Sequence, residues 1–149
     1  MGMPEFRQII ERYCRQAAIQ NSEAVIRGSP ITVHGCSVWL QYVNSADLCR
    51  VIVDLGMPDS GIPPDIWRMM LESNCTNNSR FLPFLALNPS DGHAILILQM
   101  SLDLLRDESD FPKLLDEHLA PVVQTWRKTV EIIEISYSSG HSILSSNFA

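Results

Sequence analysis

The chain has 149 residues, 46% of them hydrophobic and 19% charged, so it is long and apolar enough to fold as one domain around its own core. Its 17 acidic residues outnumber its 11 basic residues, which gives a formal net charge of −6. Nucleic acid is therefore a poor partner, because phosphate binding requires clustered lysine and arginine.

Targeting and redox signals indicate a soluble protein that stays in a reducing compartment. Residues 1–15 alternate apolar with charged side chains and contain no signal-peptide core. The apolar run Ala94–Leu98 is far shorter than the ~20 residues that a membrane-spanning helix requires, so we expect no membrane partner. The four cysteines show no CxxC spacing, and we expect reduced thiols rather than disulfides at Cys14, Cys36, Cys49 and Cys75.

The first half of the chain predicts a helix followed by three strands. From Phe6 to Ala18 apolar residues recur at the i, i+3, i+4, i+7 spacing of an amphipathic helix. After the break at 28–30 the period becomes strand-like as far as Tyr42, and a turn at 44–47 leads into a further strand, 48–55. We expect an antiparallel meander.

The middle of the chain predicts a short apolar helix and a hairpin. The helix begins near Asp65 after two prolines and ends in the asparagine-rich loop 74–80. The hairpin pairs 81–87 with 94–100. Its second strand does not alternate, so both of its faces should be covered, either by a helix on each side or by a helix on one side and a partner on the other.

The clearest helical pattern begins at Ser109 and continues to Ile133. Pro121 lies inside it, and we expect a kink or a break near Ala120. The resulting fold class is α+β with the order α-β-β-β-α-β-β-α, a twisted antiparallel sheet flanked by helices. We expect one domain, 1–135, and a flexible serine-rich tail, 136–149.

Signatures of catalysis and of cofactor binding are missing from the sequence. No glycine-rich phosphate loop and no G-x-S-x-G nucleophile motif occur. His34 and Cys36 offer two metal ligands without a second close pair. His118 lies on the apolar stripe of the last helix, where a core or interface histidine is more common than a catalytic base. Four carboxylates surround a helix start, where solvated acids cap the helix and favour the positive end of its dipole: Asp103, Asp107, Glu108 and Asp110. We therefore expect no enzyme, no cofactor and no metal.

Three local signatures, in this order and spacing, resemble the class I chaperones of type III secretion effectors, the Tir-chaperone-like family. Leu55-Gly56 precedes the second helix, Leu71-Glu72-Ser73-Asn74 closes it, and Leu115-Asp116-Glu117 precedes Trp126-Arg127 on the last helix. The resemblance covers Phe6 to Ile133. It departs from the family at Pro121 and in the serine-rich tail.

The resemblance implies a bacterial cytoplasmic virulence protein that acts without ATP. It would bind, as a homodimer, the extended N-terminal chaperone-binding segment of a cognate effector, and keep that effector soluble and secretion-competent. A receptor for an unfolded segment needs shallow apolar grooves and an exposed strand edge. By this analogy the client surface comprises Phe6, Ile9, Ile10, Tyr13, Val38, Leu40 and Tyr42.

The same analogy places the dimer contact on the second helix and the hairpin beside it, at Trp67, Met70, Leu71, Phe84 and Leu85. Trp, Met and Phe are enriched in interface cores. Ordinary core packing is the alternative for every residue of both surfaces. The alternative function is that of an α+β regulatory or adaptor protein that binds a folded partner, and a hydrolase built on unrecognised carboxylates is a distant third.

Overall fold

The computed structural model describes residues 2–139 and has the predicted α+β order, with two short helices added. Each strand pairs antiparallel with its neighbours. In chain order the elements are α1 (Met3–Gln16), α2 (Ser22–Ile26), β1 (Ile31–Val33), β2 (Cys36–Val43), β3 (Leu48–Gly56), α3 (Pro64–Thr76), β4 (Phe84–Leu87), β5 (Ala94–Ser101), α4 (Leu102–Asp107) and α5 (Phe111–Ser139).

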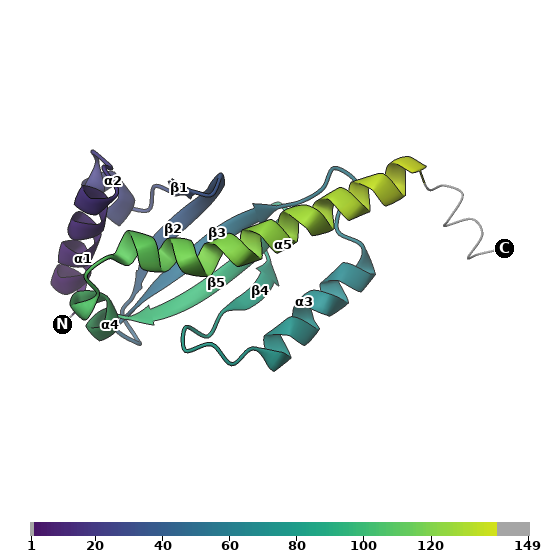
Figure 1. The fold of residues 1–149 in the computed structure, drawn as a ribbon. Helices are drawn as coiled ribbons and strands as arrows, with labels where there is room; N and C mark the ends of the chain where they lie inside the picture. The colour runs from purple at the N-terminus through teal and green to yellow at the C-terminus, as the bar shows by residue number, and fades with distance from the viewer. Residues whose placement is uncertain (1, 140–149) are drawn as a thin grey trace.

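The five strands form one sheet in the order β1-β2-β3-β5-β4, so that β3 and β5 are central and β1 and β4 are edges. Helix α5 runs across one face of this sheet, with α1 and α4 at one end and α3 beside β4 (Figure 1). The fold class predicted from the sequence is confirmed.

The two faces of the sheet differ in exposure because strand side chains alternate. Toward the helices, Val51, Val53, Leu96 and Leu98 are at most 2% exposed. Their neighbours on the opposite face, such as Ile52, are only half-buried. This opposite face is called the outer face below.

Helix α1 contributes one complete face to the core. Its first turn contains a proline, whose missing N–H has no helical partner there in any case. The Tyr13 ring packs edge-on against Phe111 of α5, with ring centroids 5.0 Å apart. Together these contacts hold α1 against the start of α5, and the buried residues of α1 are Phe6, Ile9, Ile10, Tyr13 and Cys14.

Helix α5 continues through Pro121 without interruption, so the break considered near Ala120 is not present. Leu115, Leu119 and Val123 of its inner stripe are at most 2% exposed. This packing against the sheet offsets the hydrogen bond that the proline removes. The helix also continues to Ser139, into the segment expected to be a tail; residues 140–149 of that segment lie outside the described residues.

Strand β4 is shorter than the predicted strand 81–87. Leu82 has a φ of 45°, and Pro83 follows it, so regular pairing begins only at Phe84. Phe81 still reaches the sheet, because its carbonyl accepts a hydrogen bond of 2.9 Å from the Gln99 amide.

All four cysteines are free in the structure. Within residues 2–139, none of the helices is both long enough and apolar enough to cross a membrane.

Candidate binding surfaces

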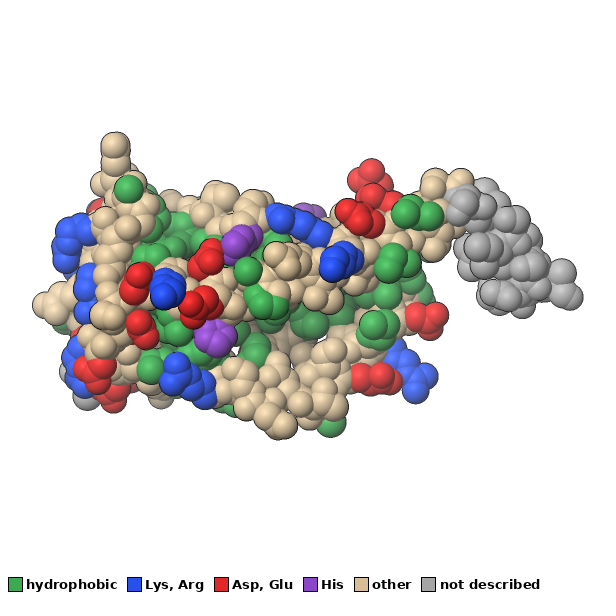
Figure 2. Space-filling view, viewed as in Figure 1, with side chains coloured by type: hydrophobic (Ala, Val, Ile, Leu, Met, Phe, Trp, Pro, Cys, Tyr) green, Lys and Arg blue, Asp and Glu red, His purple; other side chains and the backbone are tan. Residues whose placement is uncertain are grey.

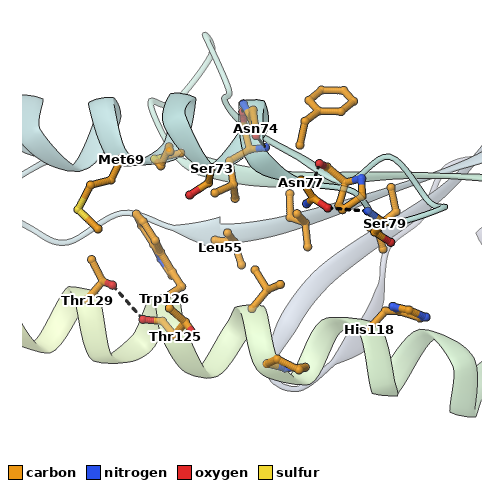
Figure 3. Close-up of a pocket in the computed structure, with 18 of the residues that line it drawn as sticks. Leu55, Met69, Ser73, Asn74, Asn77, Ser79, His118, Thr125, Trp126 and Thr129 are labelled. Carbon is orange, nitrogen blue, oxygen red and sulfur yellow. Dashed lines mark hydrogen bonds between the residues drawn. The ribbon is translucent and has the colours of Figure 1, made fainter.

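A groove of about 370 Å³ lies between α3 and α5. Figure 3 shows Met69 and Ser73 of α3 on one side and Trp126 and Thr129 of α5 on the other, with Leu55 of β3 between them. The walls are mostly apolar. The indole Nε1 of Trp126 is buried and has no hydrogen-bond partner among the described residues. The groove therefore favours apolar occupants.

The side of the groove next to β4 is held by an asparagine. The Asn74 side chain donates from Nδ2 to the Leu85 carbonyl at 2.9 Å and accepts at Oδ1 from the Leu85 amide at 2.7 Å. Asn77 Nδ2 also donates to the Pro83 carbonyl, at 3.3 Å. These bonds fix α3 and the loop that follows it against the β4 edge.

Helix α3 carries large apolar side chains on its outside. Trp67 is 45% exposed, Met69 58% and Leu71 69%, whereas Met70 on the inner side is 6% exposed. The exposed apolar surface continues on the last turns of α5, where Ile132 is 65% exposed. Figure 2 shows hydrophobic side chains between α5 and α3 at the end of the molecule away from α1.

Of the five residues expected at a dimer contact, Trp67 and Leu71 are therefore exposed and Met70 is in the core. Phe84 and Leu85 are half-buried. Contact of these residues with a second copy stays a prediction.

The outer face of the sheet carries a row of four apolar side chains. Trp39 of β2 is the cross-strand partner of Ile52 of β3, Ile52 pairs with Ile97 of β5, and Ile97 pairs with Phe84 of β4. All four are half-buried. This outer-face row explains the non-alternating sequence of β5: the helices cover one side of the strand, and the other side presents isoleucines to the outer face.

The residues expected to contact a client lie mainly inside the molecule. Phe6, Ile9, Ile10, Tyr13, Val38 and Leu40 are between 0% and 4% exposed. Tyr42 is half-buried; its hydroxyl donates to Asp47 Oδ1 at 2.8 Å, and this hydrogen bond raises the tyrosine pKa. Contact with a client is untested for all seven, and the burial of six of them favours their alternative role as core.

The carboxylates near the start of α5 act in capping and ion pairs. Asp110 Oδ1 accepts a hydrogen bond of 3.0 Å from the Lys113 amide, as an N-cap does. Asp103 and Asp107 both pair with Arg106, at 3.2 Å and 3.3 Å. Asp110 therefore caps α5 as expected, whereas Asp103 and Asp107 form ion pairs.

Three histidines make further side-chain contacts. His34 Nε2 lies 2.6 Å from Asp116 Oδ1 on α5. The nearby Cys36 thiol has a pKa raised by burial, which makes it a poorer metal ligand. His118 packs edge-on against the Phe81 ring, with ring centroids 4.4 Å apart. A third cluster, around His93, is treated below.

The chain matches no family model and no curated protein. Among solved structures it is similar to a chain of the HopA1-SchA chaperone-effector complex, with a TM-score of 0.59 and 14% sequence identity. The match covers 85% of this chain and 95% of the other. At this identity the likeness shows a shared fold, that of a chain in a chaperone-effector complex.

Proposed function

We propose that this protein is a type III secretion chaperone of the bacterial cytoplasm. As a homodimer, it binds an extended N-terminal segment of an effector and keeps that effector secretion-competent without ATP and without turnover. The outer-face row carries the proposal, because it is a multi-strand apolar surface in contact with solvent, in a fold shared with a chain of a chaperone-effector complex.

The outer-face row has the dimensions of an extended segment's side chains. Neighbouring strands are ~4.8 Å apart, so four side chains on four strands span ~14 Å. In an extended peptide, the side chains on one face follow one another at ~7 Å intervals. Two or three apolar client side chains therefore fit along the row, and Trp39 and Phe84 at its two ends supply large aromatic contacts.

Main-chain pairing would occur at one particular edge. At the β4 edge, both main-chain polar groups of Leu85 already bond to Asn74. At the other edge, β1 pairs only with β2 among the described strands. The β1 edge is therefore the better site for adding a client strand.

The homodimer would form through the exposed side of α3. Trp67 and Leu71 lie one turn apart on this side and are exposed, whereas Met69 is exposed toward the apolar groove. Trp and Met are among the residue types enriched in interface cores. Burial against a second copy would remove this surface from water, and each Å² of buried apolar area would stabilise the dimer by about 25 cal/mol.

The competing function is an adaptor that binds a folded partner. Co-expression with the product of the adjacent open reading frame separates the two, with limited proteolysis of the complex as the readout. A chaperone should protect about 50 to 100 residues near the partner's N-terminus, the scale of a segment that wraps a large surface. An adaptor would instead require the partner's folded domain, and that result would contradict the proposal.

The client surface is tested in the same assay with the double variant Ile52→Thr/Ile97→Thr. Threonine keeps the strand propensity and removes apolar contact, so the fold should persist while the partner is no longer co-purified. Met3→Thr is the control, because Met3 is 41% exposed and lies on α1, outside the row. If the double variant is folded by circular dichroism and retains the partner fully, the row is not the client site.

A further inference from the structure

One cluster at the end of the sheet brings together three side chains of metal-ligating types. His93 lies just before β5, Asp54 lies at the irregularity in β3, and Asp91 lies in the loop between β4 and β5. His93 Nδ1 is 3.0 Å from Asp54 Oδ1, 3.2 Å from Asp54 Oδ2 and 3.6 Å from Asp91 Oδ2. One ligand atom from each of the three residues lies within 4.8 Å of the other two.

Both carboxylates are already oriented by the main chain. Asp54 Oδ1 accepts a hydrogen bond of 2.8 Å from the Gly56 amide, and Asp91 Oδ1 accepts one of 2.9 Å from the His93 amide. This leaves the second oxygen of each carboxylate for another partner. Hydrogen bonds of this kind commonly orient ligands around bound metal ions.

We propose that His93, Asp54 and Asp91 bind a divalent transition-metal ion, with Zn²⁺ as the best match. One imidazole and two carboxylates suit zinc, whereas Mg²⁺ and Ca²⁺ prefer all-oxygen sites. Two ligands of a tetrahedral zinc ion, each at ~2.0 to 2.1 Å, lie ~3.3 Å apart. The separations of His93 Nδ1 from the carboxylate oxygens, 3.0 to 3.6 Å, bracket that value.

The site is accessible and leaves room for a fourth ligand. The side chains of His93 and Asp91 are 34% and 42% exposed, and that of Asp54 is 26% exposed. Water completes the coordination. The bound ion joins the β4–β5 loop to the end of β3, and this role is independent of the proposed client binding.

The test is equilibrium dialysis of tag-free protein against ZnCl₂, with the bound metal measured by mass spectrometry. All proteins carry Cys75→Ser, because Cys75 is an exposed thiol and cysteine thiolates are zinc ligands. We expect one zinc per chain and a rise in the melting temperature. The variants His93→Ala and Asp54→Asn should each lower zinc affinity at least tenfold, and Asp54→Asn keeps the acceptor for the Gly56 amide.

The matched control is His34→Ala, which removes the other described histidine that pairs with an aspartate on a different element. It should leave the zinc stoichiometry and affinity unchanged. As a second readout, Co²⁺ should give visible d–d absorption that is lost in His93→Gln. The proposal is overturned if folded His93→Ala binds zinc like the parent, if His34→Ala loses zinc equally, or if the parent binds none and His93 is only an ion-pair partner of Asp54.

Discussion

The side chain of Asn74 on α3 satisfies both main-chain polar groups of Leu85 on β4, the donor as well as the acceptor. It thus takes the place that a neighbouring strand would occupy at this edge of the sheet. An unpaired edge is a template for pairing with another chain. Asn74 therefore links the position of α3 to the protection of β4.

Replacing Asn74 should destabilise the protein and expose that edge. Asn74→Ala leaves two part-buried main-chain groups without their partner, which costs about 1 to 3 kcal/mol. Urea denaturation measures the loss, and light scattering measures association through the edge. Asn78→Ala, in the exposed loop after α3, is the control and should change stability by less than about 0.5 kcal/mol. Equal stability of the two variants would mean that the Asn74 bonds contribute nothing.

Core packing and client contact make opposite predictions for Ile10. The side chain is 0% exposed, so Ile10→Ala should lower the free energy of unfolding by about 2 to 5 kcal/mol through lost burial and a cavity. Met3→Ala, on the same helix and 41% exposed, should cost far less. If Ile10→Ala kept full stability and lost only effector binding, the assignment of Ile10 to the core would be wrong.

The dimer surface is tested by introducing charge on the exposed side of α3. Trp67→Glu/Leu71→Glu places two carboxylates at positions that are 45% and 69% exposed, so a monomer should still fold. Light scattering after gel filtration should give half the parent mass. Met3→Glu is the control and should remain a dimer. A folded double variant with the mass of the parent would place the interface elsewhere.

The order of the elements could be predicted because most of them are long enough to show a clear hydrophobic period. The stripe of α5 and the alternation of β2 and β3 both follow directly from burial on one side. The short helices α2 and α4 were missed. Their five and six residues are too few to show a period, although Asn21 and Ser101 cap their first turns.

The binding surfaces were harder to predict, because apolar character does not tell which residues are exposed. Ile9 and Ile52 look equally apolar in the sequence, yet one is in the core and the other on the outer face. Only the strand register joins Trp39, Ile52 and Ile97 into one row. The His93 cluster likewise depends on bringing the β4–β5 loop to the end of β3, and no local motif marks that contact.

Two buried ionisable groups, the Cys49 thiol and the Tyr13 hydroxyl, should make the folded state less stable at high pH. Burial raises the pKa of Cys49 from 9.0 to about 12, and burial, followed by the charges of Cys14 and Asp116, raises that of Tyr13 from 10.0 to about 12. Above the ordinary values the unfolded chain releases these protons and the folded chain keeps them. Stability is therefore fully present below pH 9 and falls from there toward pH 12, by about 1.4 kcal/mol per pH unit for each proton.

Urea midpoints measured from pH 8 to pH 11 test this slope. Tyr13→Phe should flatten it above pH 10, whatever it does to the stability at neutral pH. Tyr137→Phe is the control, because Tyr137 is 46% exposed. An unchanged slope in Tyr13→Phe would mean that this phenol does not keep its proton in the folded state.

The tip of the β1–β2 hairpin is a two-residue turn whose residues both have positive φ, 51° at His34 and 77° at Gly35. This is the type I′ geometry that favours glycine. A Cβ on Gly35 would lie 3.0 Å from Arg127 Nη2, and the Arg127 guanidinium donates a hydrogen bond to the His34 carbonyl. Gly35→Ala thus adds two costs, backbone strain and displacement of Arg127.

Gly56→Ala separates these two costs, because Gly56 has the same φ of 77° and its Cβ would meet nothing within 4 Å. The strain alone should cost about 1 to 2 kcal/mol. Gly35→Ala should cost about 0.5 to 1.5 kcal/mol more, the value of a typical hydrogen bond. In an Arg127→Ala background that excess should disappear, since the displaced group is already gone. An excess that persists without Arg127 would show that the strain at the turn, and not the contact with α5, determines the stability of the hairpin tip.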